Sequence, residues 1–299
     1  MRPLQPLFAV LVLAFFAGCT TVPETGRRQL ILVPVEQEAQ LGAATFAQIQ
    51  QEEKVSNNPQ YNAQVSRVGE RIAAAVGREV PGADWDFIVF ESDQINAFAL
   101  PGGKVGVYTG LLKLVESDDE LATVMGHEIA HVTSRHGAER MSQGTLAQGA
   151  GLLGNLALGS SEMSPGVQQA VMAAYGIGAT LGMNYYSRSH ELEADTVGLR
   201  FAAAAGYDPN ASVRFWRKMQ AANERSAKPP EFLSTHPSDE RRIANLEQLA
   251  REYYPLYQQA RSQMGGSGVI GGSTPGNGVI GSGSPGTIGS DPKGGVIGR

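Results

Sequence analysis

His127-Glu128-Ile129-Ala130-His131 lies near the middle of this 299-residue chain, and the rest of the sequence can be interpreted outward from it. Residues four apart share one face of a helix, so the two imidazoles can bind a single Zn2+. Zinc lowers the pKa of a bound water to about 7, and Glu128 is placed to take the released proton as general base. The pentapeptide alone is only moderately specific, because two surface histidines beside a glutamate would give the same pattern.

The helix expected to carry this motif has a well-defined start. Ser117-Asp118-Asp119-Glu120 has the S-x-x-E pattern of a capping box, and acidic residues in a first turn suit the helix dipole. The helical pattern continues to about Met141. Both histidines of the motif are therefore predicted to lie on one helix.

A second carboxylate motif, Glu191-Leu192-Glu193-Ala194-Asp195, follows on another predicted helix that covers about Arg188 to Ala205. Glu191 and Asp195 are four apart and share a face, so Glu191 can be the third metal ligand. Asp195 can accept a hydrogen bond from the far nitrogen of a ligating histidine, which fixes its tautomer. Glu193 points elsewhere on the helix and is interpreted as a solvated charge. The alternative for the whole motif is an ordinary acidic helix face.

The chain has 5 histidines and 1 cysteine, so a cysteine-rich metal site is excluded. His136 is five residues past His131, about 140° round a continuous helix, and does not share the metal face. It is interpreted, with Arg140, as structural and paired with nearby carboxylates or carbonyls. His190 adjoins Glu191 but points about 100° away, and we do not expect it to be a ligand.

The N-terminus predicts a lipoprotein. An apolar run from Leu4 to Phe16 has the length of a signal-peptide core, and small residues precede Cys19 as in a lipobox. Residues 1–18 are expected to be a signal peptide, Cys19 the lipidated residue that anchors the chain to a membrane, and residues 19–28 a tether. An uncleaved anchor or an ordinary signal peptide with an incidental cysteine are the alternatives. Thr20 and Thr21 follow the cysteine, and the absence of aspartate at these positions is typical of lipoproteins sorted to the outer membrane.

Between the N-terminus and the histidine motif the pattern changes from helical to strand-like. Helices are predicted over Gln37 to Val55 and Asn58 to Val76, followed by strands over Trp85 to Phe90, Ile95 to Leu100 and Lys104 to Tyr108. Helices also dominate the second half of the chain. The sequence therefore predicts an α+β fold in which a mostly helical domain, residues 29–263, places a small β-sheet beside the motif helix.

Two segments of the second half have unusual composition. Gly166 to Met183 is nearly long enough to span a bilayer, but its glutamines and glycines favour a buried or lid-like hairpin. A last helix is predicted from about Asp239 to Tyr253. From Met264 onward Gly, Ser and Pro dominate, so residues 264–299 are expected to be a disordered tail.

The spacing of the two motifs resembles a known family. HExxH followed some 60 residues later by ExxAD is similar to the CAAX-prenyl-protease and HtpX-type zinc metallopeptidases, and within them to the bacterial periplasmic lipoprotein branch. The similarity covers about residues 26 to 252. Four further segments carry it: Asn96 to Gly103, His136-Gly137 with Arg140, Tyr186-Ser187-Arg188, and Ser234-Thr235-His236-Pro237. Prenyl-peptide activity and docking through tetratricopeptide repeats are not carried over, because we expect this sequence to contain neither the multi-helix membrane core of the prenyl proteases nor the repeat region.

The resemblance implies a gluzincin-like domain with one Zn2+ per chain, held by His127, His131 and Glu191, with Glu128 as catalytic base. It implies that His236 lies near the metal, where it either stabilises the oxyanion or occupies the open zinc position in a resting state. The stretch Asn96, Ala97, Phe98 and Ala99 is expected to present an edge strand above the zinc, to which a substrate peptide adds by main-chain pairing.

These expectations converge on one function: a zinc-dependent endopeptidase of the bacterial cell envelope that cleaves misfolded or stalled envelope proteins. We expect it in the periplasm, lipid-anchored to the inner leaflet of the outer membrane, with the outer-membrane assembly machinery as a partner. The net charge of −5 and the lack of a basic block exclude nucleic acid as an obvious partner. The alternatives are a chaperone-like or assembly-factor lipoprotein with a regulated or mainly structural zinc site, and an integral inner-membrane protease that uses Gly166 to Met183 as a span.

Overall fold

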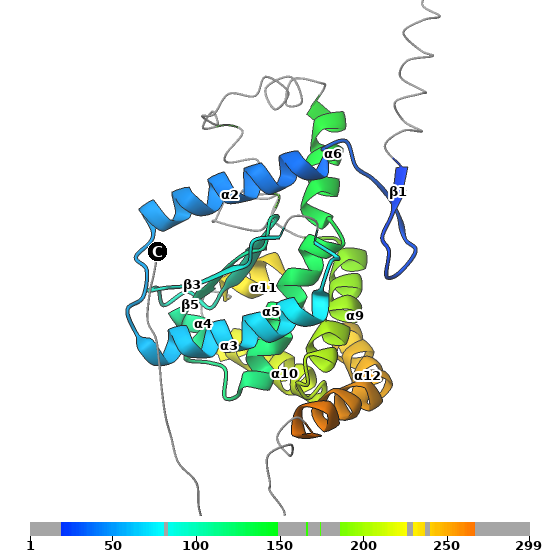
Figure 1. Cartoon of the computed structure of the whole chain (residues 1–299). Helices are drawn as coiled ribbons and strands as arrows, with labels where there is room; N and C mark the ends of the chain where they lie inside the picture. Colours follow the sequence, from blue (N-terminus) through cyan, green and yellow to red (C-terminus); the bar gives the residue numbers. More distant parts are fainter. Residues whose placement is uncertain are drawn as a thin grey trace, which may run out of the picture.

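The computed structural model describes residues 19–80, 83–148, 166, 174, 186–225, 230–236 and 240–266. These residues form an α+β domain, mostly helical with a small sheet, as the sequence predicts (Figure 1). The elements follow one another in this order: β1 (Cys19–Thr21), β2 (Arg28–Leu30), α2 (Val35–Glu52), α3 (Pro59–Val76), β3 (Asp86–Phe90), β4 (Ala97–Leu100), β5 (Lys104–Tyr108), α4 (Thr109–Leu112), α5 (Asp118–Thr133), α6 (His136–Gln148), α9 (Arg188–Ala204), α10 (Asn210–Arg225), α11 (Glu231–Thr235) and α12 (Glu240–Gly266).

The central sheet has the strand order β3-β5-β4. Strand β5 pairs in parallel with β3 and antiparallel with β4, so β4 lies at one edge of the described sheet. The turn between β4 and β5 is the predicted Pro101-Gly102-Gly103, and both glycines adopt positive φ, 82° and 84°. A side chain rarely adopts this conformation, which explains two successive glycines at this position.

Alternating side chains of the sheet face two different helical layers. Val89, Val107 and Ala97 belong to the core that the sheet shares with α3 and α5. Phe90 and Phe98 face the opposite way and pack with α2. The period of two along each strand therefore builds a helix–sheet–helix sandwich, in which α5 lies directly under β4 (Figure 1).

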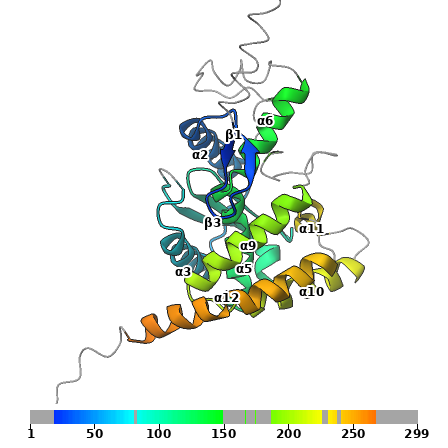
Figure 2. The ribbon, with the colours of Figure 1, turned by 90° about the vertical axis from the view of Figure 1, so that its right-hand side faces the viewer.

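Helices α5 and α9 cross at two glycines. A Cβ atom on Gly126 would lie 2.7 Å from the carbonyl oxygen of Gly198, and one on Gly198 would lie 2.6 Å from the carbonyl oxygen of Gly126. The two backbones are thus in contact, with α9 passing across α5 in Figure 2. This close crossing brings the two predicted motifs together, since His127 follows Gly126 directly.

The helix that carries the histidine motif begins as predicted and ends earlier. The Ser117 hydroxyl accepts a hydrogen bond from the Glu120 backbone N–H at 3.2 Å, which is the first half of the capping box. The Glu120 carboxylate, however, accepts from the backbone N–H of Glu116. The predicted continuation to Met141 is wrong, because Arg135 has a φ of 56° and separates α5 from α6.

The first and last described segments contain more regular structure than the sequence predicts. Residues 19–28, predicted as a tether, contribute β1 and the turn of an N-terminal hairpin (Cys19–Leu30) whose strands are antiparallel. At the other end α12 continues past Tyr253, through Pro255, to Gly266. The predicted signal peptide, most of the segment from Gly166 to Met183, and the tail beyond residue 266 lie outside the described residues.

No helix within the described segments combines the length and the hydropathy that a bilayer span needs.

Candidate metal centre

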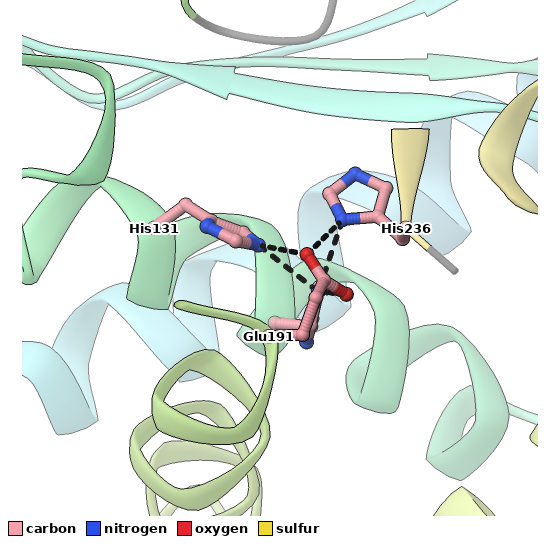
Figure 3. Close-up of side chains that lie close together, drawn as sticks. His131, Glu191 and His236 are labelled. Atoms are coloured by element: carbon pink, nitrogen blue, oxygen red, sulfur yellow. Dashed lines mark hydrogen bonds and ion pairs between the residues drawn. The ribbon is translucent and has the colours of Figure 1, made fainter. Parts of the chain in front are cut away.

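Four side chains from three parts of the chain converge on one buried point. His127 and His131 project from α5, Glu191 from the first turn of α9, and His236 follows directly after α11. One ligand atom from each lies within 4.8 Å of the others, and all four residues are buried. Figure 3 shows the Glu191 carboxylate between His131 and His236, with strands of the sheet passing over the site.

The separations between these ligand atoms suit a tetrahedral cation. Nε2 of His127 lies 3.1 Å from Nε2 of His131 and 3.3 Å from Nδ1 of His236. The Glu191 oxygens lie 3.5 Å from His127 Nε2, 3.4 Å from His131 Nε2 and 3.0 Å from His236 Nδ1. Ligands bound at about 2.0–2.1 Å around a tetrahedral zinc are about 3.3–3.4 Å apart, so the donor set fits this metal.

Asp195 occupies the position predicted for it behind His127. Its Oδ1 atom lies 2.9 Å from Nδ1 of His127, which leaves Nε2 of the ring directed at the other ligand atoms. Burial lowers the pKa of His127, but the charge of Glu191 and the hydrogen bond to Asp195 outweigh it and raise the pKa to about 9. The two carboxylates beside this ring therefore favour a positive charge, which a bound cation would supply in place of the ring proton.

Arg242 is a site residue that the sequence did not reveal. Its guanidinium binds both oxygens of Asp195, at 2.7 and 2.8 Å, and its Nη1 lies 2.6 Å from Oε2 of Glu191. It stacks on Trp216, with Cζ 3.6 Å from the ring centroid. No local pattern marks Arg242, which lies 47 residues beyond Asp195 on a helix whose face only the fold defines.

Arg242 also keeps the ligand carboxylate ionised. Burial alone would raise the pKa of the Glu191 carboxyl, but Arg242, His236 and His127 hold that pKa well below its usual value. The oxygen Oε2 of Glu191 accepts no well-aligned hydrogen bond from the described residues, despite its ion pair with Arg242. A buried carboxylate that stays charged in this way is suited to bind a metal.

Glu128 faces the same point from α5. Its Oε1 atom lies 3.3 Å from Nε2 of His236, and the residue is buried. Burial raises the pKa of the Glu128 carboxyl above its usual value, against the opposing charges of His236 and His127. A raised pKa suits a carboxylate that accepts and returns a proton near neutral pH.

His136 and Glu193 have different surroundings from those expected. The break at Arg135 turns His136 back toward the site, so its Nδ1 lies 2.8 Å from Nδ1 of His131. Its Nε2 lies 2.8 Å from Oε2 of Glu193, which confirms a pairing with a carboxylate. The interpretation of Glu193 as a solvated charge is wrong, because Glu193 is buried and also binds Arg27.

The remaining predicted residues lie near the site or at the N-terminus. His190 pairs through Nε2 with Glu139 at 3.0 Å. Ala97 and Ala99 belong to β4, whose buried residues lie over α5, and the Asn96 side chain accepts a hydrogen bond from the Ala97 N–H. Cys19 begins β1 and is exposed.

The sequence was compared with known protein families and curated proteins. The pattern of the family described as Peptidase family M48 matches residues 59–250. A relative in Vibrio cholerae is 36% identical over 242 residues, which are 79% of this chain and 48% of that protein. The protein named Beta-barrel assembly-enhancing protease in Escherichia coli K12 is 32% identical over 251 residues, which are 83% of this chain and 50% of that protein.

A eukaryotic relative covers more of its own length. The protein named Mitochondrial metalloendopeptidase OMA1 in Schizosaccharomyces pombe is 32% identical over 241 residues, which are 80% of this chain and 68% of that protein. The chain spans about half the length of the two bacterial relatives. All of the predicted metal ligands and Glu128 lie inside the matched range 59–250.

Proposed function

The chain belongs to peptidase family M48, and from that membership we propose that it is a zinc-dependent endopeptidase of the bacterial cell envelope. The observation that carries the proposal is the convergence of His127, His131 and Glu191, with Glu128 buried beside them. The names of the relatives, which include protease and metalloendopeptidase, support a peptide substrate.

In this proposal His127, His131 and Glu191 hold one Zn2+, and Asp195 and Arg242 orient two of these ligands. Bound zinc would polarise the scissile carbonyl as a Lewis acid. Glu128 accepts the proton of the attacking water and returns it to the leaving amine. The buried carboxylate with a raised pKa is suited to both transfers.

His236 has a resting role in this proposal. Its Nδ1 atom lies in the fourth position of the donor set, which a catalytic zinc site keeps open for water or substrate. Its Nε2 atom lies 3.3 Å from Oε1 of Glu128, so the ring occupies space that the attacking water and the substrate carbonyl would need. We infer that the ring must leave this position before peptide cleavage, after which it can approach the oxyanion.

The substrate is proposed to pair with β4. This strand lies at an edge of the described sheet, and the sheet passes over the site. In the antiparallel register the backbone groups of Ala97 and Ala99 point away from β5, because Asn96 and Tyr108 form a hydrogen-bonded pair. The Asn96 side chain already holds the Ala97 N–H, so a peptide would have to displace it or pair beyond it.

The biological setting rests on the sequence and on the relatives' names. We propose that the clients are misfolded or stalled envelope proteins, that Cys19 carries the lipid anchor, and that the protein works in the periplasm at the inner leaflet of the outer membrane. The name Beta-barrel assembly-enhancing protease supports a connection to the outer-membrane assembly machinery.

One observation favours a second function. The fourth donor position is filled by His236, and structural zinc sites are closed in this way. A chaperone-like or assembly-factor role with a regulated or structural zinc is therefore the competing proposal.

The substitution Glu128→Gln separates the two functions. As an enzyme, the variant should retain one zinc per chain and lose casein cleavage by about 10²–10⁴-fold, because general-base catalysis is removed. The measurement combines metal analysis with casein digestion by the purified full chain. Unchanged cleavage by Glu128→Gln would reject Glu128 as the general base. No cleavage by the zinc-loaded wild type on any unfolded protein would reject the endopeptidase and favour the second function.

A further inference from the structure

Arg27, at the end of the turn in the N-terminal hairpin, reaches two buried carboxylates of the domain. Its Nε lies 2.7 Å from Oε2 of Glu193 on α9, and its Nη2 lies 2.7 Å from Oε2 of Glu139 on α6. The turn holds its backbone, because the carbonyl of Arg27 accepts a hydrogen bond from the Val22 N–H at 2.9 Å. The hydroxyl of Thr25, in the same turn, also donates to Glu193.

The carboxylate of Glu193 connects this hairpin to a proposed zinc ligand. Oε2 of Glu193 lies 2.7 Å from Arg27 and 2.8 Å from Nε2 of His136. Nδ1 of His136 lies 2.8 Å from Nδ1 of His131. Three successive contacts of hydrogen-bond length therefore join Arg27 to His131, and all the side chains except that of Arg27 are buried.

The chemistry of the imidazoles gives this chain one direction. His131 uses Nε2 toward the other metal ligands, so its proton is on Nδ1 and is donated to Nδ1 of His136. His136 then carries its own proton on Nε2 and donates it to Glu193. The neutral His136 thus lies between the carboxylate of Glu193 and His131, and it orients His131 on behalf of that carboxylate. For His127 the carboxylate of Asp195 makes this contact directly.

A second branch from Arg27 supports the same histidine from the side. Glu139 binds Arg27 through both oxygens, at 2.7 and 3.2 Å, and binds Nε2 of His190 at 3.0 Å. The ring of His190 stacks on that of His136, with centroids 4.3 Å apart and planes within 19°. Arg27 therefore holds both the acceptor of His136 and the residue packed against its face.

We propose that Arg27 is a positioning residue for the metal site, which acts on His131 through Glu193 and His136. The N-terminal hairpin is then part of the metal site, although it contributes no ligand. This inference rests on the proposed zinc site. Outer partners of metal ligands typically contribute 10–100-fold in metal affinity, and we expect about 10-fold for Arg27 because it acts through two residues.

The test compares Arg27→Met with Arg200→Met in the full chain. Arg200 is a matched control: its side chain is 29% exposed against 25% for Arg27, and it also binds two carboxylates, Glu24 of the same hairpin and Glu79. Zinc affinity is measured by competition with a chromogenic chelator, well below the melting temperature of each variant. We expect about 10-fold weaker binding for Arg27→Met, and wild-type affinity for Arg200→Met.

A double-mutant cycle with His136→Phe distinguishes positioning from a general loss of stability. In a chain of contacts, Arg27→Met should cost no further zinc affinity once His136→Phe has cut the chain. Arg27→Lys, which retains the charge but cannot bind both carboxylates as a fork, should lie between wild type and Arg27→Met. Arg27→Lys replaces Arg27→Met in this test if Arg27→Met does not fold.

If the wild type binds zinc, two results would overturn this inference and leave the proposed function standing. One is equal zinc affinity in Arg27→Met and Arg200→Met, and the other is additive losses of zinc affinity in the cycle of Arg27→Met and His136→Phe. A wild-type chain that binds no zinc would instead overturn the proposed function, and this inference with it.

Discussion

His127 and His131 lie one turn apart on α5, yet their outer nitrogens are held by different parts of the molecule. Behind His127 lies Asp195, a direct carboxylate fixed by the buried Arg242. Behind His131 lies His136, a second imidazole that leads to Glu193 and to Arg27. The first support comes from the C-terminal half of the chain, and the second reaches the N-terminal hairpin.

The two histidines of a symmetrical motif can thus be held by unequal sets of contacts, and these sets are here called their supports. In both cases a carboxylate would set the tautomer of a proposed ligand, but for His131 it would do so through one more residue. The His127 support should therefore have the larger effect on metal binding.

The largest effect is expected at the crossing of α5 and α9, on which both supports depend. In Gly198→Val the new Cβ would lie 2.6 Å from the Gly126 carbonyl oxygen, and neither backbone can move without separating the helices. We expect zinc binding to be lost and the free energy of unfolding to fall by about 3 kcal/mol or more, since overpacking typically costs 1–3 kcal/mol and occasionally more. Metal analysis and urea unfolding measure both.

The control for this substitution is Gly144→Ala on α6. Among the described residues, no atom lies within 4 Å of a Cβ placed on Gly144, so alanine should leave zinc binding unchanged and stabilise the helix by roughly 0.5–1 kcal/mol. Normal zinc binding by Gly198→Val would show that the helices do not need this close approach.

The two supports are compared directly by Asp195→Asn and Glu193→Gln. Each substitution keeps the shape of the side chain and removes its charge. Zinc affinity should fall by about 10–100-fold in Asp195→Asn, because Asp195 contacts His127 directly, and by roughly 10-fold or less in Glu193→Gln. Chelator competition gives both values. Equal losses, or the reverse order, would break the proposed ranking.

The smallest effect concerns Glu139, the partner of Arg27 and His190, and how its contribution to stability changes in acid. Burial would raise the pKa of Glu139, but His190 and Arg27 outweigh it and lower the pKa from 4.5 to about 2. A carboxyl with a lowered folded-state pKa stabilises the fold above its unfolded-state pKa, and this contribution is lost as the pH falls toward the folded-state value. The stability gap between wild type and Glu139→Gln should therefore be full above about pH 5 and shrink between pH 4.5 and 2.

Urea unfolding of the metal-free proteins at pH 7 and pH 3 measures this gap. Removing zinc with a chelator excludes loss of the metal in acid as a cause, and protonation of groups that both proteins share cancels in the difference. Arg200→Met serves again as the matched ion-pair control. A gap that widens toward pH 3 would have the wrong sign for this account.

The spacing of residues along the sequence was sufficient to predict Asp195 as a partner of a histidine of the motif. It was insufficient to predict the contacts of His136 and Glu193 behind His131. The four-residue intervals His127–His131 and Glu191–Asp195 place side chains on shared helix faces, so the residues that converge in the fold could be named from the sequence. The α+β fold and the strands near Phe90, Leu100 and Tyr108 were predicted for the same reason, since short patterns determine them.

The second support could not be predicted because it depends on a helix break and on distant contacts. On a continuous helix His136 would point about 140° away from His131, but the positive φ of Arg135 ends α5 and reverses that direction. Arg135 is itself held by Glu38, 97 residues earlier. Glu193 appeared solvated because its partner Arg27 lies 166 residues away.

Anomalous diffraction at the zinc edge from crystals of the full chain tests the central claim most directly. The account predicts one peak per chain, at about 2.0–2.2 Å from Nε2 of His127, Nε2 of His131 and a carboxylate oxygen of Glu191. A peak at another place, or none in zinc-loaded crystals, would contradict it.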